Sequence, residues 1–324
     1  MENKTPIKVD DKKIITVFGA TGAQGGGLAR AILADKNSEF AVRVVTRDAN
    51  SEKSKAFAQL GAEVVEANID DIQSIKKAID GAYGAYFVTF FWDHFSVDKE
   101  LQEVNNFIEA ARESHLQHII WSTLEDTRNW MKLDDDRMPT LHGKYKVPHF
   151  DGKGEADHYF REAELPTTFL RTSFYWDNFI HFGMGPQKGE DRNYYIAFPM
   201  DDKKLAAIAA EDIGKCAYGI FKKGKELIGK TVGIAGEKLN GNEMAEKLSK
   251  ALNKKVLFNP VTPEAYRNFG FPGADDLGNM FQFKRDFNDD FNGARNEVFA
   301  KELNPELQNF DMWLSVNASR IPIQ

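Results

Sequence analysis

Short runs of β-branched and aromatic residues alternate with helical segments through the first half of this chain of 324 residues. The runs expected to form strands are residues 14–18, 42–46, 63–66, 85–89, 118–122 and 167–171. Between them, apolar residues recur at helical spacing over residues 27–34, 51–60, 72–79, 97–113 and 153–164. This alternation predicts an α/β protein with a doubly wound parallel sheet, the Rossmann fold, in which ligands bind at the carboxyl ends of the strands.

A glycine-rich turn lies between the first expected strand and the helix that follows it. Glycines in such a turn permit a tight bend and a close approach of the backbone to a pyrophosphate, whose charge the helix N-terminus stabilises. An ordinary turn is the alternative, but the flanking strand and helix and the five further alternations favour a dinucleotide site. The residues expected to contact the cofactor here are Gly19, Thr21, Gly22, Ala23, Gln24 and Gly25.

The end of the second strand selects the dinucleotide. Proteins that bind NAD usually place an acid there to hold the ribose hydroxyls, whereas this chain has Arg47. A guanidinium holds a 2′-phosphate in a bidentate geometry, so NADP(H) is the expected cofactor. Lys53 adds positive potential, with a solvated surface lysine as its alternative. Asp48 would weaken the preference for the phosphate if it turned inward.

Further contacts are expected where the third and fourth strands end. Ile69 and Asp70 stand where such folds place an apolar contact and an acid around the adenine. A helix cap formed by Asp70 or Asp71 is an equally good interpretation. Thr89 is expected near the cofactor, and the aromatic residues 90–92 form either a wall beside the nicotinamide or part of the core.

The second half of the chain is less regular. Strands are expected at residues 194–198 and 231–235, and helices at residues 211–221, 242–252, 275–287 and 294–303. We predict an NAD(P)-binding domain over residues 12–172 and a smaller C-terminal α/β lobe over residues 173–324. The lobe would bind a substrate or partner, with Met280, Phe281 and Phe283 lining a cleft. Because the two parts are interleaved, the lobe is not expected to fold alone.

Composition excludes several other classes of protein. The single cysteine, Cys216, excludes an intramolecular disulfide and a cysteine-built metal site, and fits a reducing, cytoplasmic setting. The net charge of -7 argues against direct binding of nucleic acid. No apolar run is long enough to span a membrane, and residues 1–12 have the character of a polar tail rather than a secretion signal. The histidines lack metal-ligand spacing, so no metal site is expected.

The chain resembles the NmrA-like family of atypical short-chain dehydrogenases/reductases. The resemblance rests on the glycine turn, on Arg47 and above all on the segment His149-Phe-Asp-Gly-Lys-Gly-Glu-Ala-Asp-His-Tyr-Phe160, and it extends to residues 165–171 and 270–281. It implies a Rossmann fold with a smaller C-terminal lobe, a preference for NADP(H), and a role in sensing the cofactor's redox ratio or regulating a protein partner. By the same resemblance, residues Phe174, Tyr175 and Asn178 would roof the nicotinamide site, with ordinary core packing as the alternative for the aromatic residues but not for Asn178.

The sequence leaves catalysis open. Short-chain dehydrogenases use a Tyr-x-x-x-Lys pair with a serine after the fifth strand, and here His149 and Lys153 have that spacing while Ser122 follows the fifth strand. An imidazole transfers protons near neutral pH. The related isoflavone-reductase branch uses a lysine in the same helix context for proton transfer. At the expected start of its helix, Lys153 would need a partner such as a bound ribose, and a solvated lysine is the alternative.

The missing tyrosine and the resemblance favour an NADP(H)-binding sensor or regulator. The alternative is an NADPH-dependent reductase of a small quinone, enone or carbonyl, in which Lys153 or His149 relays the proton. The sequence names neither a substrate nor a protein partner.

Overall fold

The computed structural model describes residues 12–323, so the predicted polar tail lies almost wholly outside the described residues. Its largest sheet is parallel throughout, with strand order β11-β6-β5-β4-β1-β2-β3. The strands are β1 (Lys13–Val17), β2 (Phe40–Thr46), β3 (Glu63–Glu66), β4 (Gly84–Phe87), β5 (His118–Thr123), β6 (Thr167–Arg171) and β11 (Thr231–Gly233). The strand order reverses between β1 and β4, and this is the switch point where such sheets bind ligands.

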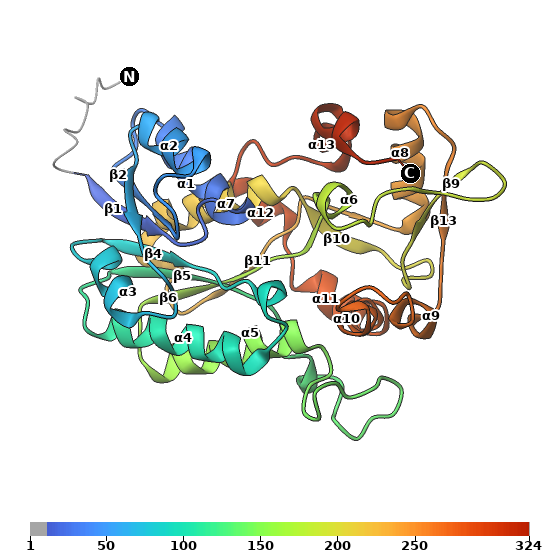
Figure 1. Ribbon diagram of the computed structural model, residues 1–324, viewed down its shortest axis with the longest axis horizontal. Helices are drawn as coiled ribbons and strands as arrows, with labels where there is room; N and C mark the ends of the chain where they lie inside the picture. Colours follow the sequence, from blue (N-terminus) through green and yellow to red (C-terminus); the bar gives the residue numbers. More distant parts are fainter. Residues whose placement is uncertain (1–11, 324) are drawn as a thin grey trace.

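Helices cover both faces of this sheet. Figure 1 shows helices α1, α2 and α7 above the sheet and α3, α4 and α5 below it. Their bounds are α1 (Ala23–Ala34), α2 (Glu52–Gln59), α3 (Ile72–Ile79), α4 (Val97–Arg112), α5 (Pro148–Glu162) and α7 (Ala210–Lys223). Each face has its own apolar core, one centred on Leu28 and Ile213 and the other on Phe87 and Phe107. The prediction of a doubly wound α/β fold is confirmed.

Helices α1 and α7 pack at very close range through glycines. A Cβ atom at Gly27 would lie 2.4 Å from the carbonyl oxygen of Glu211, and one at Gly214 would lie 2.0 Å from the amide of Leu28. Strand β11 pairs in parallel with β6 and is thus part of the large sheet. Helix α7 packs against α1 and helps to cover one face of that sheet. Both elements follow residue 172 in the chain. The boundary at residue 172 therefore does not separate the elements of that sheet from those of the lobe.

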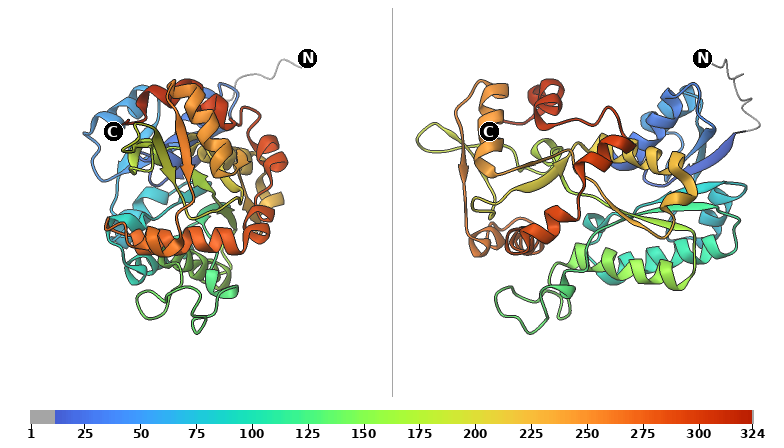
Figure 2. Two further views of the ribbon diagram at one scale, coloured as in Figure 1. Left: turned by 90° about the vertical axis from the view of Figure 1, so that its right-hand side faces the viewer. Right: turned by 180° about the vertical axis from the view of Figure 1, so that it is seen from behind.

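The C-terminal lobe contains two small sheets and most of the remaining helices. Figures 1 and 2 show it beside the large sheet along the long axis of the molecule. One sheet joins β12 (Glu237–Leu239), β10 (Leu205–Ile208) and β7 (Phe174–Tyr175), and the other joins β13 (Val256–Asn259), β9 (Tyr194–Ala197) and β8 (Gln187–Lys188). The helices are α6 (Asn178–His181), α8 (Gly241–Leu252), α9 (Pro263–Arg267), α10 (Ala274–Asp286), α11 (Asn288–Gly293) and α13 (Phe310–Asn317). Helix α12 (Glu297–Leu303) instead packs against α7 of the large sheet.

The lobe has an aromatic core that includes Trp176, Phe198 and Trp313. Met280, Phe281 and Phe283 are buried in this core, so the prediction that they line a cleft is wrong. Their helical spacing reflects a helix that is buried on most of its sides. Among the described residues, none of the helices is long and apolar enough to cross a membrane.

Two helix starts differ from the sequence prediction in ways that affect the site. Helix α1 begins at Ala23 rather than at residue 27, with Gly22 as its N-cap. Helix α5 begins at Pro148 rather than at residue 153. Proline is favoured at the first helical position because its missing N–H has no partner there in any case. Lys153 therefore lies in the second turn of its helix and not at its start.

Candidate functional site

The glycine turn occupies the switch point between β1 and β4. Gly19 has a φ of +65°, and a Cβ atom there would lie 2.7 Å from Cγ1 of Val88, which follows β4. A Cβ at Gly25 would lie 2.6 Å from the carbonyl oxygen of Gly19. Helix α1 has neither a side-chain cap nor an acid in its first turn. Its open amides and positive dipole end fit an anion such as a pyrophosphate.

Two cations stand beside this turn. The side chain of Arg47, just beyond β2, is 82% exposed and its Nη1 lies 3.8 Å from Oδ2 of Asp93. The Nζ atom of Lys53 donates to the carbonyl oxygen of Thr21 at 3.1 Å. The Oδ1 atom of Asp48 accepts from the amide of Asn50 at 2.8 Å, so this carboxylate is hydrogen-bonded within the turn that contains it. The guanidinium of Arg47 is thus accessible to a phosphate.

For the residues after β3, the sequence left open a contact around the adenine and a helix cap. In the structure, Asp70 and Asp71 have different partners. The side chain of Asp71 accepts from the amide of Gln73 and caps α3. Asp70 instead pairs with Lys99 of α4. The carbonyl oxygen of Ile69 accepts from the side chain of Asn106 at 2.8 Å. The helix cap is formed by Asp71. Ile69 and Asp70 therefore lie in the loop at the carboxyl end of β3 without serving as that cap.

Gln24 links three hydroxyl groups from different strands. Its Oε1 accepts from the hydroxyls of Tyr86 at 2.5 Å and Ser122 at 2.7 Å, and its Nε2 donates to the hydroxyl of Tyr175 at 2.7 Å. Burial raises the pKa of Tyr175 to about 12, so this hydroxyl keeps its proton. The structure therefore brings Gln24, Ser122 and Tyr175 together, as three residues that the sequence indicated separately. Tyr86 was missed, because a tyrosine inside a buried strand has no local signal beyond its hydroxyl.

Lys153 is held in a buried polar cluster. Its Nζ donates to Oγ1 of Thr89 at 2.6 Å and lies 2.9 Å from Oε1 of Glu100. The Thr89 hydroxyl donates to the same Glu100 oxygen at 2.5 Å, and the ring of Trp121 lies 4.9 Å from the ammonium. This corrects the expectation of a lysine at a helix start and the alternative of a solvated lysine, because Lys153 is buried in the second turn and Glu100 of α4 is its partner. A contact of Lys153 with a ribose stays a prediction. An acid in the first turn of a helix normally indicates only a favourable dipole interaction, so the sequence did not mark Glu100.

His149 contacts the C-terminal lobe. Its Nδ1 lies 2.6 Å from Oδ1 of Asp276 in α10, and its backbone N–H donates to Oδ2 of the same carboxylate at 3.1 Å. Its ring centroid lies 4.8 Å from that of Trp92, 4.8 Å from that of Phe150 and 6.0 Å from that of Phe91. The aromatic residues after β4 therefore enclose the imidazole. The sequence contained Asp276 within a segment that carried the resemblance but did not mark it as a partner.

The residues predicted to roof the site lie in different surroundings. Phe174 is buried in the lobe core against Phe179, Phe198 and Phe281. This corrects the expectation that its ring roofs the nicotinamide, because neighbouring side chains enclose it. Asn178 begins α6 and is half-buried.

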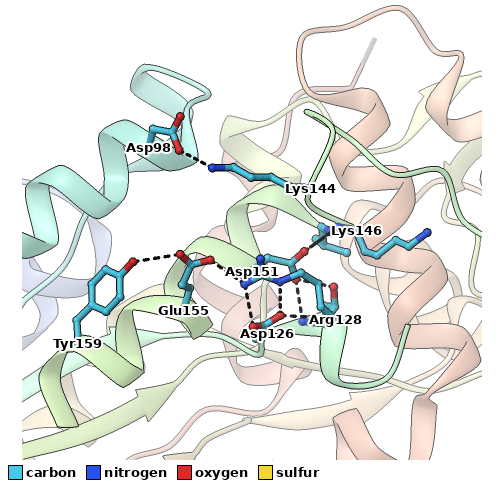
Figure 3. A network of polar contacts seen from close by, with 10 residues as sticks. Asp98, Asp126, Arg128, Lys144, Lys146, Asp151, Glu155 and Tyr159 are labelled. Atoms are coloured by element: carbon cyan, nitrogen blue, oxygen red, sulfur yellow. Dashed lines mark hydrogen bonds and ion pairs between the residues drawn. The ribbon is translucent and has the colours of Figure 1, made fainter. Parts of the chain in front are cut away.

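A polar network anchors the start of α5, as Figure 3 shows. The Asp151 carboxylate accepts from the amide and the hydroxyl of Thr127 at 2.8 and 2.6 Å. It also accepts from the amides of Lys146 and Val147 at 2.8 and 3.1 Å. Burial raises the pKa of Asp151 to about 6. Because these contacts tie α5 to the connection after β5, they fix the helix that carries His149 and Lys153.

The same network extends along the outer side of α5. Arg128 forms ion pairs with Asp126 and Glu155, and Glu155 accepts from the hydroxyl of Tyr159 at 3.1 Å. These contacts keep the second and third turns of the helix against the short helix at Thr127–Asn129. Charged contacts therefore hold the segment that resembles the family at Asp151 and at Glu155.

The parallel sheet, its strand order and the glycine turn at its switch point define a protein of the Rossmann-fold class. Within that class, the model of the NmrA-like family matches residues 11–314. The chain belongs to the NmrA-like family.

Several relatives and solved structures are similar to this chain. An NmrA-like family domain-containing protein of Dictyostelium discoideum is 28% identical over 262 residues, which are 78% of this chain and 82% of that protein. The NmrA-like family domain-containing oxidoreductase lnbB of Aspergillus flavus is 27% identical over 290 residues, 84% of this chain and 83% of that protein.

Among solved structures, the negative transcriptional regulator NmrA in complex with NADP has a TM-score of 0.73 at 19% identity, covering 94% of both chains. The triphenylmethane reductase of Citrobacter sp., complexed with NADP(H), has a TM-score of 0.71 at 18% identity, covering 94% of this chain and 99% of that one. At these identities, the two structures confirm the fold.

Proposed function

We propose that this protein binds NADP(H) and catalyses the NADPH-dependent reduction of a small quinone, enone or carbonyl. The cofactor assignment is supported by the open glycine turn at α1, which fits a pyrophosphate, and by the accessible guanidinium of Arg47 with Lys53 beside it. Two solved structures of the same fold were obtained with NADP or NADP(H) bound. When bound, NADPH would supply a hydride to the substrate.

The observation that carries the reductase role is the surroundings of His149. The imidazole takes the place of the usual tyrosine, one helical turn before Lys153, and aromatic rings enclose it. A titratable ring in an apolar setting suits proton transfer to a flat, apolar substrate, because water does not compete for the proton there. Lys153, held by Glu100 and Thr89, supplies a fixed positive charge at the carboxyl end of β4.

The relatives support the same role, since several of them are described as oxidoreductases, lnbB of Aspergillus flavus among them. Triphenylmethane reductase shares the fold. The regulator favoured by the sequence remains the second candidate, and two observations favour it. Ser122 is engaged by Gln24, and Lys153 is committed to a buried ion pair. NmrA, which shares the fold, is described as a negative transcriptional regulator. A protein partner and a cytoplasmic location stay predictions.

The test follows the absorbance of reduced nicotinamide in the presence of quinones, enals and aldehydes. We expect turnover with at least one of these classes, and its loss in His149→Gln. The matched control is His158→Gln, which changes an exposed histidine of the same helix. If no substrate is turned over, and proteolysis of residues 173–324 differs between NADP+ and NADPH, the reductase proposal fails and the regulator is favoured.

A further inference from the structure

Asp276 of the lobe contacts His149, on a helix of the large sheet, through both of its carboxylate oxygens. Its Oδ1 lies 2.6 Å from Nδ1 of the ring, and its Oδ2 accepts from the backbone N–H of His149 at 3.1 Å. Both side chains are buried. A backbone N–H can only donate, so one carboxylate oxygen is committed to the amide and the other faces the ring.

This geometry determines which ring nitrogen carries a proton. Asp276 lies in the first turn of α10, with one carboxylate oxygen on the backbone N–H of His149 and the other on Nδ1 of its ring. An ionised carboxylate only accepts hydrogen bonds, so His149 presents an N–H at Nδ1. Within residues 12–323, no hydrogen bond to Nε2 of His149 is found, and this nitrogen is left for another partner.

Trp92 holds the imidazole and the start of α10 together. The N-cap of α10 is Gly273, with a φ of +82°, and a Cβ atom there would lie 2.8 Å from Cζ3 of Trp92. The ring centroid of Trp92 lies 4.8 Å from that of His149. Since Trp92 contacts both the helix start and the imidazole, it limits rotation of the His149 ring away from Asp276.

We propose that Asp276 is the positioning residue for His149: it fixes the proton on Nδ1 and leaves Nε2 as the nitrogen that exchanges a proton with the substrate. The proposal rests on the proposed reductase function. In the reduction of a carbonyl, the carbon gains the hydride that NADPH supplies, and NADP+ remains. The π electron pair moves to the oxygen, which takes the proton from Nε2 of the imidazolium. The ring becomes neutral, and it takes up one proton from the bulk solvent before the next turnover, so that each reduction consumes one hydride and one solvent proton.

The decisive variant is Asp276→Asn, which keeps the shape of the side chain. The backbone N–H of His149 still requires an acceptor, so the amide oxygen must face it. The amide NH2 group then faces Nδ1, which must become an acceptor, and the proton of the neutral ring moves to Nε2. Nitrogen-15 spectra of the imidazole report this tautomer directly, and His149→Gln assigns the signals.

We expect the wild-type ring to be protonated at Nδ1 and the Asp276→Asn ring at Nε2. We also expect turnover to fall by at least about a hundredfold in this variant, as is typical for loss of a general acid–base group, with the Kd for NADPH unchanged. Asp275→Asn is the matched control, since it removes the same charge from the neighbouring exposed residue of the same helix. It should change neither the tautomer nor the turnover.

The two proposals fail separately. An unchanged tautomer in Asp276→Asn, in a protein whose unfolding midpoint matches that of the wild type, overturns the role of Asp276 whether or not the protein is an enzyme. An inverted tautomer with unchanged turnover also overturns it. Absence of turnover in the wild type overturns the reductase function. In that case the role of His149 Nε2 in proton exchange with a substrate is also overturned. An inverted tautomer in Asp276→Asn would then still show that Asp276 orients His149.

Discussion

The ammonium of Lys153 lies 2.9 Å from Oε1 of Glu100, and the Glu100 side chain is completely buried. Thr89 bridges the two groups, since its hydroxyl donates to Glu100 and accepts from Lys153. The Oε2 atom of Glu100 is buried without a hydrogen-bond partner in the described part of the chain. The charge of Lys153 is therefore compensated by this one carboxylate, inside the protein and next to the carboxyl end of β4.

Glu100→Gln should destabilise the fold by about 3–5 kcal/mol, because it leaves the Lys153 charge buried without a partner. Adding Lys153→Met should restore most of the loss, since the variant then buries no charge. Urea denaturation measures both changes. Glu39→Gln is the control, because its ion pair with Lys13 is exposed, and it should cost less than about 1 kcal/mol. A loss below 1 kcal/mol in Glu100→Gln would contradict the role given to this pair.

Arg47→Ala should weaken binding of NADPH and NADP+ by about 10- to 100-fold, the value of a charge-assisted hydrogen bond. Binding of NAD and NADH should stay the same, since these cofactors lack the 2′-phosphate. Calorimetric titration with all four nucleotides checks this, with the exposed Arg192→Ala as the control. Equal losses for NADP(H) and NAD(H) would show that Arg47 does not contact the 2′-phosphate.

Gly25→Ala should weaken NADP(H) and NAD(H) alike, by about tenfold or more, which is about 1.4 kcal/mol. A Cβ atom at Gly25 would lie 2.6 Å from the carbonyl oxygen of Gly19, so the turn must shift away from the pyrophosphate common to both cofactors. Gly293→Ala is the matched control, since within residues 12–323 no atom beyond its chain neighbours and its own helix backbone lies within 4 Å of a Cβ there. A selective loss of NADP(H) would argue against a pyrophosphate at this turn.

Lys284→Met should stabilise the protein, and more so at pH 7 than at pH 10. Lys284 is buried among aromatic rings, and within residues 12–323 the only hydrogen-bond partner of its ammonium is Sδ of Met280, at 3.2 Å. Burial lowers its pKa to about 7, from the ordinary 10.5, and the nearby charge of Arg295 acts in the same direction.

The direction of this pH dependence follows from whether Lys284 holds a proton in the folded and in the unfolded chain. Between about pH 7 and 10.5, the unfolded chain holds a proton on Lys284 that the folded chain does not. Wild-type stability therefore falls as the pH is lowered through this window, by at most about 1.4 kcal/mol per pH unit, and Lys284→Met removes that loss. Urea denaturation at several pH values measures it, with the exposed Lys250→Met as the control. A gain that does not change with pH would contradict this explanation.

Local features of the fold were predictable because they depend on neighbouring residues. The strands at 63–66 and 167–171 and the helix at 72–79 have the expected bounds. The helix at 153–164 was placed too late, because its first two turns contain proline and glycine, which weaken the helical pattern. The seventh strand, β11, was expected as a strand, but its place beside β6 follows from the crossover of α7 over the large sheet.

The residues of the candidate site likewise fall into those that the sequence predicted and those that it missed. The glycine turn and Arg47 were found from the sequence, because short-range spacing places them at strand ends. Glu100, Tyr86 and Asp276 were missed, because each acts on a residue distant along the chain.

The alternation of strands and helices, the glycine turn and the family could be read from the amino-acid sequence, since these are properties of residues close together along the chain. The pairing of Glu100 with Lys153 and of Asp276 of the lobe with His149 is visible only in the folded molecule. A buried charge or polar nitrogen requires a partner, and packing selects which distant side chain supplies it.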